Sequence, residues 1–148
     1  MVFCDAPGQE KYRSMNLLFS KNSDIVIFVY EIANKNSFIQ LKEFWVQSII
    51  KKIGNDVIFG LAATKSDLFQ REELSIEEGI EYAKEIGATF RLTSAKNEEE
   101  GIILFINELI EKVLYKKKLI QSGEKILFQI TKKENLNRFC TLYKYLNI

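Results

Sequence analysis

Residues 24–32 read DIVIFVYEI, a stretch in which apolar residues follow one another instead of alternating with polar ones. Such a run is typical of a strand that is buried on both faces, as strands are in a parallel sheet. Residues 2–4, 56–63 and 88–92 have the same character. We therefore expect four strands of a mainly parallel sheet.

The segments between these runs have helical periodicity. Apolar residues recur at spacings of three and four over residues 36–52 (Phe38, Leu41, Trp45, Ile49) and over residues 100–117 (Ile102, Phe105, Ile106, Leu109, Ile110, Val113, Leu114). Ser75 followed by Glu78 is a capping-box pattern for a helix that ends near Gly87. Lys116, Lys117 and Lys118 are expected in the last turn of the final helix. Alternating strands and helices predict a doubly wound α/β domain with its ligand site beyond the carboxyl ends of the strands.

The composition of the chain excludes several classes of protein. The chain has 148 residues, enough for one domain, and a formal charge of +1, so no global field favours nucleic acid. Histidine is absent, which excludes a Ser-His-Asp or Cys-His hydrolase. Cys4 and Cys140 are far apart and lack a zinc spacing, so we expect reduced thiols in a cytosolic protein.

Three short motifs follow three of the expected strands. Residues 5–10 read DAPGQE, residues 64–67 read TKSD and residues 93–96 read TSAK. Because the carboxyl ends of parallel strands lie at one end of the sheet, the three motifs are expected to form one site.

The order and spacing of these motifs resemble the conserved boxes of the Ras-superfamily small GTPases. Residues 11–15 resemble the second switch of that family, and residues 27–32 and 36–38 with Trp45 look specifically Rab-like. The resemblance covers roughly residues 1–118 as a partial small-GTPase domain and leaves residues 119–148 as a C-terminal extension. It implies the P-loop NTPase-like fold, while a generic doubly wound domain with chance matches is the alternative.

A carboxylate suits recognition of guanine, whose ring N–H and amino group offer two donors on one edge. The residue placed for this contact is Asp67. By resemblance, Lys65 lies along the base and the backbone N–H of Ala95 donates to the guanine carbonyl. Other residues of these boxes that the resemblance places at the nucleotide are Thr64, Ser94 and Lys96. The alternative is that residues 64–67 form a surface turn capped by the aspartate.

The first motif is the counterpart of the family's phosphate and metal box. By resemblance, Asp5 reaches Mg²⁺ through water, the N–H of Gly8 meets the terminal phosphate, and Gln9 orients the attacking water. Ala6 and Pro7 stand where the family has Thr and Ala, and proline should make this switch stiffer. The alternative is that the Pro-Gly pair serves only as a turn.

The phosphate-binding loop of the family, Gly-x-x-x-x-Gly-Lys-Ser/Thr, does not occur in the sequence, because none of the seven glycines precedes a lysine. We therefore expect an N-terminally truncated domain with weak nucleotide binding and little hydrolysis. In the family the first strand lies between the strands that match residues 2–4 and 24–32. The chain is expected either to close this gap or to leave it open.

The tail has a pattern of its own. Residues 125–131 alternate like a strand and residues 135–145 read as a short mixed helix. A tail that packs back on the domain without joining the sheet is favoured, and pairing at a strand edge or in the gap is the alternative. The sequence ends in Leu-Asn-Ile with no prenylatable cysteine, so a direct membrane anchor is not expected.

The resemblance implies a Rab-like GTPase, a switch that binds GTP or GDP with Mg²⁺ and acts in vesicle traffic with regulatory and effector proteins of the Rab type. It would be cytoplasmic and peripheral on endomembranes. The alternative is a non-catalytic pseudo-GTPase that keeps the fold as a binding module.

Overall fold

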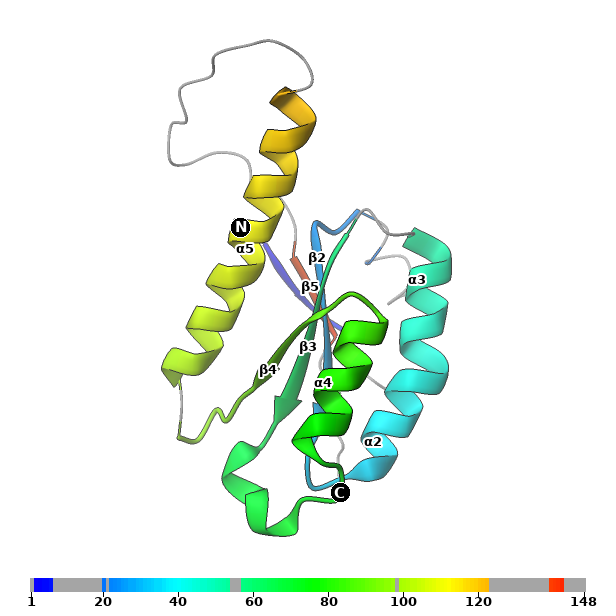
Figure 1. Cartoon of the computed structure of the whole chain (residues 1–148), viewed down its shortest axis with the longest axis vertical. Helices are drawn as coiled ribbons and strands as arrows, with labels where there is room; N and C mark the ends of the chain where they lie inside the picture. Colours follow the sequence, from blue (N-terminus) through cyan, green and yellow to red (C-terminus); the bar gives the residue numbers. More distant parts are fainter. Residues whose placement is uncertain are drawn as a thin grey trace.

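One parallel sheet of five strands forms the centre of the molecule (Figure 1). The computed structural model describes residues 2–6, 20, 22–53, 57–97, 99–122 and 139–142. Within them the strand order is β1-β5-β2-β3-β4, and every pairing is parallel. The strands are β1 (Phe3–Asp5), β2 (Ile25–Glu31), β3 (Ile58–Thr64), β4 (Thr89–Leu92) and β5 (Phe139–Leu142). The four strands expected from the sequence are confirmed, with β2 and β3 as parallel neighbours.

Helices lie on both sides of this sheet, as expected. One continuous helical run consists of α2 (Lys35–Gln40), the π-helical η2 (Leu41–Val46) and α3 (Gln47–Ile53). It is followed by the 3₁₀ helix η3 (Ser66–Arg71), then α4 (Ile76–Glu85) and α5 (Glu99–Ser122). In Figure 1, α5 lies on one side of the sheet, and α2, α3 and α4 lie on the other. The predicted doubly wound α/β class is confirmed.

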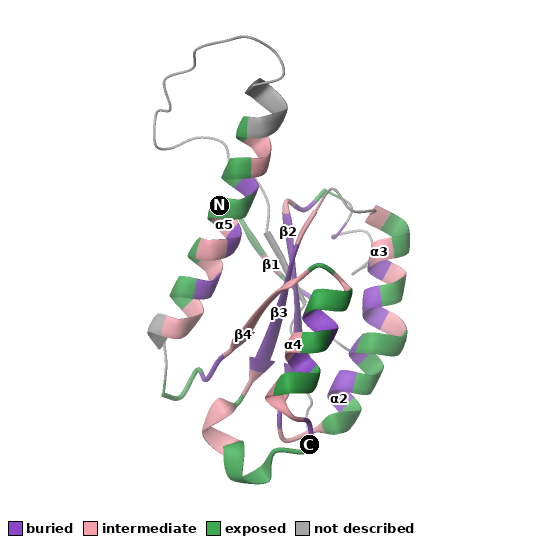
Figure 2. Cartoon of the chain, in the orientation of Figure 1, coloured by how far each residue is buried: buried purple, intermediate pink, exposed green. Residues whose placement is uncertain are grey.

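The strand β2 supplies both layers of the core, which explains its unbroken apolar sequence. Val26, Phe28 and Tyr30 belong to the cluster beneath α2–α3 and α4. Ile25, Ile27 and Val29 point to the opposite face, toward α5. The predicted helical stripe of Phe38, Leu41, Trp45 and Ile49 is buried, and Figure 2 shows buried residues concentrated on the central strands and the inward sides of the helices.

The helix α5 packs closely on the sheet through Phe105, Leu109 and Val113, all at most 3% exposed. Burying an apolar side chain of this size contributes roughly 1.5–3 kcal/mol. Gly60 of β3 permits the approach, since a Cβ there would lie 2.8 Å from Phe105 and 2.9 Å from Leu109. The helix is thereby fixed against β3, the strand that leads to the TKSD motif.

The start of α4 is the predicted capping box. The backbone N–H of Glu78 donates to the Ser75 hydroxyl, and the N–H of Ser75 donates to the Glu78 carboxylate, each at 3.2 Å. The helix ends at Glu85, just before Gly87, whose φ of 67° is left-handed.

The end predicted for the last helix was wrong. The helix α5 continues to Ser122, so Lys116, Lys117 and Lys118 lie before its last turn. Leu119 and Ile120 do not interrupt a helix, and the next poor helix former in the sequence is Gly123. Lys117 instead pairs with Asp24, with 2.8 Å between Nζ and Oδ1.

No helix within the described ranges is both long enough and apolar enough to cross a bilayer.

The favoured prediction for the tail was also wrong where the structure describes it, and the alternative, pairing in the gap, is what the described strand does. Residues 139–142, expected in a short helix that stays out of the sheet, form β5 between β1 and β2. Both sides of the strand find backbone partners there, and its aromatic and β-branched residues fit a strand. This is the position that the resemblance gave to the family's first strand. The strand expected over residues 125–131 lies outside the described residues.

Candidate functional site

The strands β1, β2 and β3 end at Asp5, Glu31 and Thr64, and β4 ends just before the TSAK motif. Backbone hydrogen bonds join the loops after β3 and β4. The N–H of Ser66 donates to the carbonyl of Thr93 at 3.1 Å, and the N–H of Thr93 donates to the carbonyl of Ala63 at 2.8 Å. Two of the three motifs are therefore held side by side.

Asp67 and Ser94 make the closest side-chain contact between these two motifs. The hydroxyl of Ser94, which is 1% exposed, donates to Oδ1 of Asp67 at 2.6 Å. The hydroxyl oxygen of Ser94 also accepts from the backbone N–H groups of Lys96 and Asn97, at 3.2 and 3.3 Å. Ser94 thus holds its own loop and the aspartate together. An ionised carboxylate has about four lone-pair sites, so Asp67 can accept further hydrogen bonds from a ligand.

The charge of Asp67 is stabilised by its surroundings. The hydrogen bond from Ser94 is the main reason that the pKa of Asp67 lies below its ordinary value, and the positive charges of Lys96 and Lys65 act in the same direction. The carboxyl is therefore ionised at neutral pH and can accept hydrogen bonds through both oxygens.

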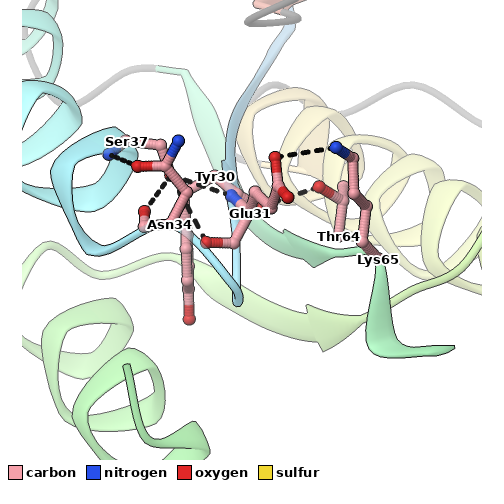
Figure 3. Close-up of polar contacts among 6 residues, drawn as sticks. All are labelled: Tyr30, Glu31, Asn34, Ser37, Thr64 and Lys65. Carbon is pink, nitrogen blue, oxygen red and sulfur yellow. Dashed lines mark hydrogen bonds and ion pairs between the residues drawn. The ribbon is translucent and has the colours of Figure 1, made fainter. Parts of the chain in front are cut away.

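Lys65 turns the chain from β3 into η3. Its φ of 59° and ψ of 41° make it the only non-glycine residue with a positive φ in the described part of the chain. Its ammonium group lies 2.8 Å from the carboxylate of Glu31, at the end of the neighbouring strand (Figure 3). This partner was missed in the sequence, although Glu31 stands level with Thr64 across the two strands.

A small polar frame supports this turn (Figure 3). The hydroxyl of Thr64 donates to the carbonyl of Tyr30 at 2.9 Å, which joins the ends of β3 and β2. Asn34 caps α2 by accepting from the N–H of Ser37 at 3.1 Å, and the Ser37 hydroxyl accepts from the N–H of Glu31 at 3.0 Å. The frame fixes the backbone of Glu31, whose side chain then positions Lys65.

The remaining predicted site residues lie at the surface, farther away or outside the described residues. Ala95 and Lys96 are exposed and directly follow Ser94. Asp5 is exposed at the end of β1, and two strands, β5 and β2, separate β1 from β3. Gly8 and Gln9 lie outside the described residues. Contacts of any of these residues with guanine, phosphate or Mg²⁺ stay predictions.

The predicted Mg²⁺ site has a single carboxylate, that of Asp5. Among the residues that the structure describes, no group of three or more His, Cys, Asp or Glu side chains is placed to hold a metal ion. The residues suited to a guanine base are better defined, because Asp67, Ser94 and Lys65 are held by direct contacts.

A parallel α/β sheet with TKSD and TSAK loops joined beyond its strands is typical of nucleotide-binding proteins. Residues 1–115 match the family model of the Ras family. The chain belongs to the Ras family of small GTPases, whose members bind GTP and GDP with Mg²⁺ and act through regulators and effectors.

Proposed function

We propose that this chain is a Rab-like member of the Ras family that reads guanine through Asp67, and that its full-length form is a GTP-binding switch in vesicle traffic. The Rab-like assignment rests on the segment around Glu31, Ser37 and Trp45. It implies effectors and regulators of the Rab type, a cytoplasmic location and peripheral association with endomembranes.

The observation that carries the guanine proposal is the 2.6 Å hydrogen bond from Ser94 to Asp67. It orients an ionised carboxylate at the junction of two loops, where the two donors of a guanine edge can meet it. In the corresponding positions adenine has an acceptor, its ring N1, and a C–H group at C2, so it pairs poorly with a carboxylate. Selectivity for guanine over adenine is therefore the property expected of this site.

Lys65 and Ala95 complete the proposed base site. The salt bridge with Glu31 holds the lysine side chain at the turn, so that its apolar stem can lie along a purine. Ala95 follows Ser94 in an exposed turn, where a backbone N–H can reach the guanine carbonyl. The sequence offers no Gly-Lys-Ser/Thr loop for the phosphates, so base contacts supply most of the binding by this chain.

The test is titration of a fluorescent GTP analogue into the chain, with unlabelled GTP and ATP as competitors. We expect weak binding that GTP displaces better than ATP. Asp67→Asn should weaken it at least about tenfold, because the amide group replaces one acceptor by a donor that faces the guanine donors.

A matched control is Asp24→Asn, the same substitution at the amino end of β2, where the carboxylate pairs with Lys117. This variant should bind like the unchanged chain. Equal affinity for GTP and ATP, unaffected by Asp67→Asn, would contradict guanine recognition. Submicromolar binding that Asp67→Asn abolishes would instead show that the phosphate loop is dispensable.

A second candidate is a non-catalytic binding module with the GTPase fold. The absence of a Gly-Lys-Ser/Thr loop from the sequence favours it, because Gln9 can orient water only around a phosphate that other groups hold. The coding sequence upstream of Met1 separates the two, because this chain is expected to hydrolyse little GTP in either case. A Gly-Lys-Ser/Thr box in frame there would support the switch, and a gene without such a box would support the module.

A further inference from the structure

The strand β5 occupies an interior position of the sheet, although it comes from the C-terminal tail. It pairs with β1 on one side and with β2 on the other. Because β1 lies at the edge of the sheet, β5 is the one described strand that pairs with it. The segment that ends in Asp5 is therefore joined to the rest of the sheet through the tail.

The side of β2 that faces away from β3 needs such a partner. Its residues Ile25–Phe28 are 0–5% exposed, and the same four residues stand in register with Phe139–Leu142. Backbone N–H and C=O groups at this depth are almost always paired, because leaving them unpaired away from water is costly. The position between β1 and β2 is therefore an acceptor for an extended, parallel strand.

We propose that Phe139–Leu142 is a strand insert that fixes β1 to β2, so that the tail of the chain positions Asp5 relative to the loops that carry Asp67 and Ser94. The register supports this, since Asp5 stands level with Thr141, which stands level with Ile27 of β2. The statement concerns this chain, in which β5 is the described strand between β1 and β2. The role of Asp5 rests on the guanine-nucleotide binding proposed for this chain, whereas the strand insertion does not.

The two cysteines of the chain provide a direct test. Cys4 and Cys140 are register partners in β1 and β5, and Cys4 is only partly buried. Adjacent strands lie about 4.8 Å apart, within the roughly 4.4–6.8 Å between Cα atoms that a disulfide spans. Mild oxidation of the folded chain should form an intramolecular disulfide at least about tenfold faster than in the chain unfolded in urea, because pairing raises the effective thiol concentration.

The matched control moves one thiol by one residue. In the double variant Cys140→Ser with Thr141→Cys the new cysteine stands level with Asp5 and on the other face of the strand, so rapid cross-linking to Cys4 should be lost. Peptide mapping without reduction identifies the product. Equal rates in folded and unfolded chains would overturn the proposal, and so would a disulfide between two chains, which would show that a second copy supplies the strand.

A second measurement uses substitutions at one position of the insert. Cys140→Pro removes a backbone donor from the middle of β5, whereas Cys140→Val suits a strand. Hydrogen exchange at Phe3–Asp5 should become at least about tenfold faster in the proline variant only, with β4 as the internal reference. Equal protection in both variants would overturn the proposal. A failed nucleotide titration would remove the proposed function but leave both of these results intact.

Discussion

Asp67 is half-buried, and its ionisation depends on a fully buried neighbour. The Ser94 hydroxyl donates to its carboxylate and is the main cause of a pKa below the ordinary aspartate value. Ser94→Ala should therefore raise this pKa toward the usual value of about 3.9. Carbon-13 NMR titration of the Asp67 carboxyl measures the change directly.

The same shift has a consequence for ligand binding. A lowered pKa keeps the carboxylate charged until the pH falls through that lowered value, so guanine binding should fade only in distinctly acid solution. In Ser94→Ala the loss should begin at higher pH. Thr93→Ala is the control, because the Thr93 hydroxyl donates to the Ala63 carbonyl and not to Asp67. An unchanged Asp67 pKa in Ser94→Ala would contradict the assigned cause.

The contacts of single residues also show how much of the candidate site could be predicted from the sequence. That Asp67 and Ser94 would lie near each other followed from their places after parallel strands. The salt bridge between Lys65 and Glu31 did not, because it depends on the left-handed backbone of Lys65 and on the register of β2 with β3. Neither can be read from residue types, since lysine rarely adopts a positive φ.

At the scale of elements, the contact of α4 with the sheet depends on Gly79. A Cβ at this position would collide with the hydroxyl of Tyr30 and lie 2.8 Å from the ring of Phe90. Alanine would improve helix propensity by roughly 1 kcal/mol, but overpacking a buried contact typically costs more. We expect Gly79→Ala to lower the free energy of unfolding by about 1–2 kcal/mol, measured by urea denaturation.

A second substitution identifies the cause of this loss. Tyr30→Phe removes the hydroxyl that the new Cβ would meet, so the double variant should recover part of the stability. Glu81→Ala, at an exposed position of the same helix, should change little. If the effects of Gly79→Ala and Tyr30→Phe on the free energy of unfolding simply add, the collision with the Tyr30 hydroxyl is not the cause of the lost stability.

The elements that the sequence predicted best are those with local signals. The apolar stripe of α2–α3 and the capping box of Ser75 and Glu78 each specify a helix within a few residues of chain. The strand β5 carries no such signal, because four residues are too short for a periodic pattern. Its partners, Phe3–Asp5 and Ile25–Phe28, lie far away in the sequence. Only the tertiary arrangement determines which conformation these four residues adopt.

At the scale of the whole molecule, the core layer beneath α2 and α4 should make the fold sensitive to alkaline solution. Burial raises the pKa of Tyr82 to about 12 and raises that of Tyr30 further. Both hydroxyls are buried without a hydrogen-bond partner. In the unfolded chain these groups ionise near pH 10, so the folded state holds more protons above that pH.

The stability contributed by the neutral tyrosines is therefore complete below about pH 10 and is lost as the pH rises through the folded-state values, by at most about 1.4 kcal/mol per pH unit for each group. Denaturation measured from neutral to alkaline pH should show this fall. Tyr82→Phe should reduce it, and should not destabilise the neutral protein, because it removes an unpaired hydroxyl. Tyr115→Phe, at a residue 66% exposed, is the control and should leave the fall unchanged.

The interior position of β5 also bears on how the chain folds during synthesis. The ribosome makes β1 before the other described strands and β5 after them, yet the two are neighbours in the finished sheet. The local units formed by β2, β3 and β4 with their helices can assemble early, whereas β1 has to wait for the last strand. Contacts of such long sequence separation slow folding and prolong the lifetime of exposed strand edges. The newly made chain is thus most exposed to aggregation and to chaperone capture until β5 is inserted.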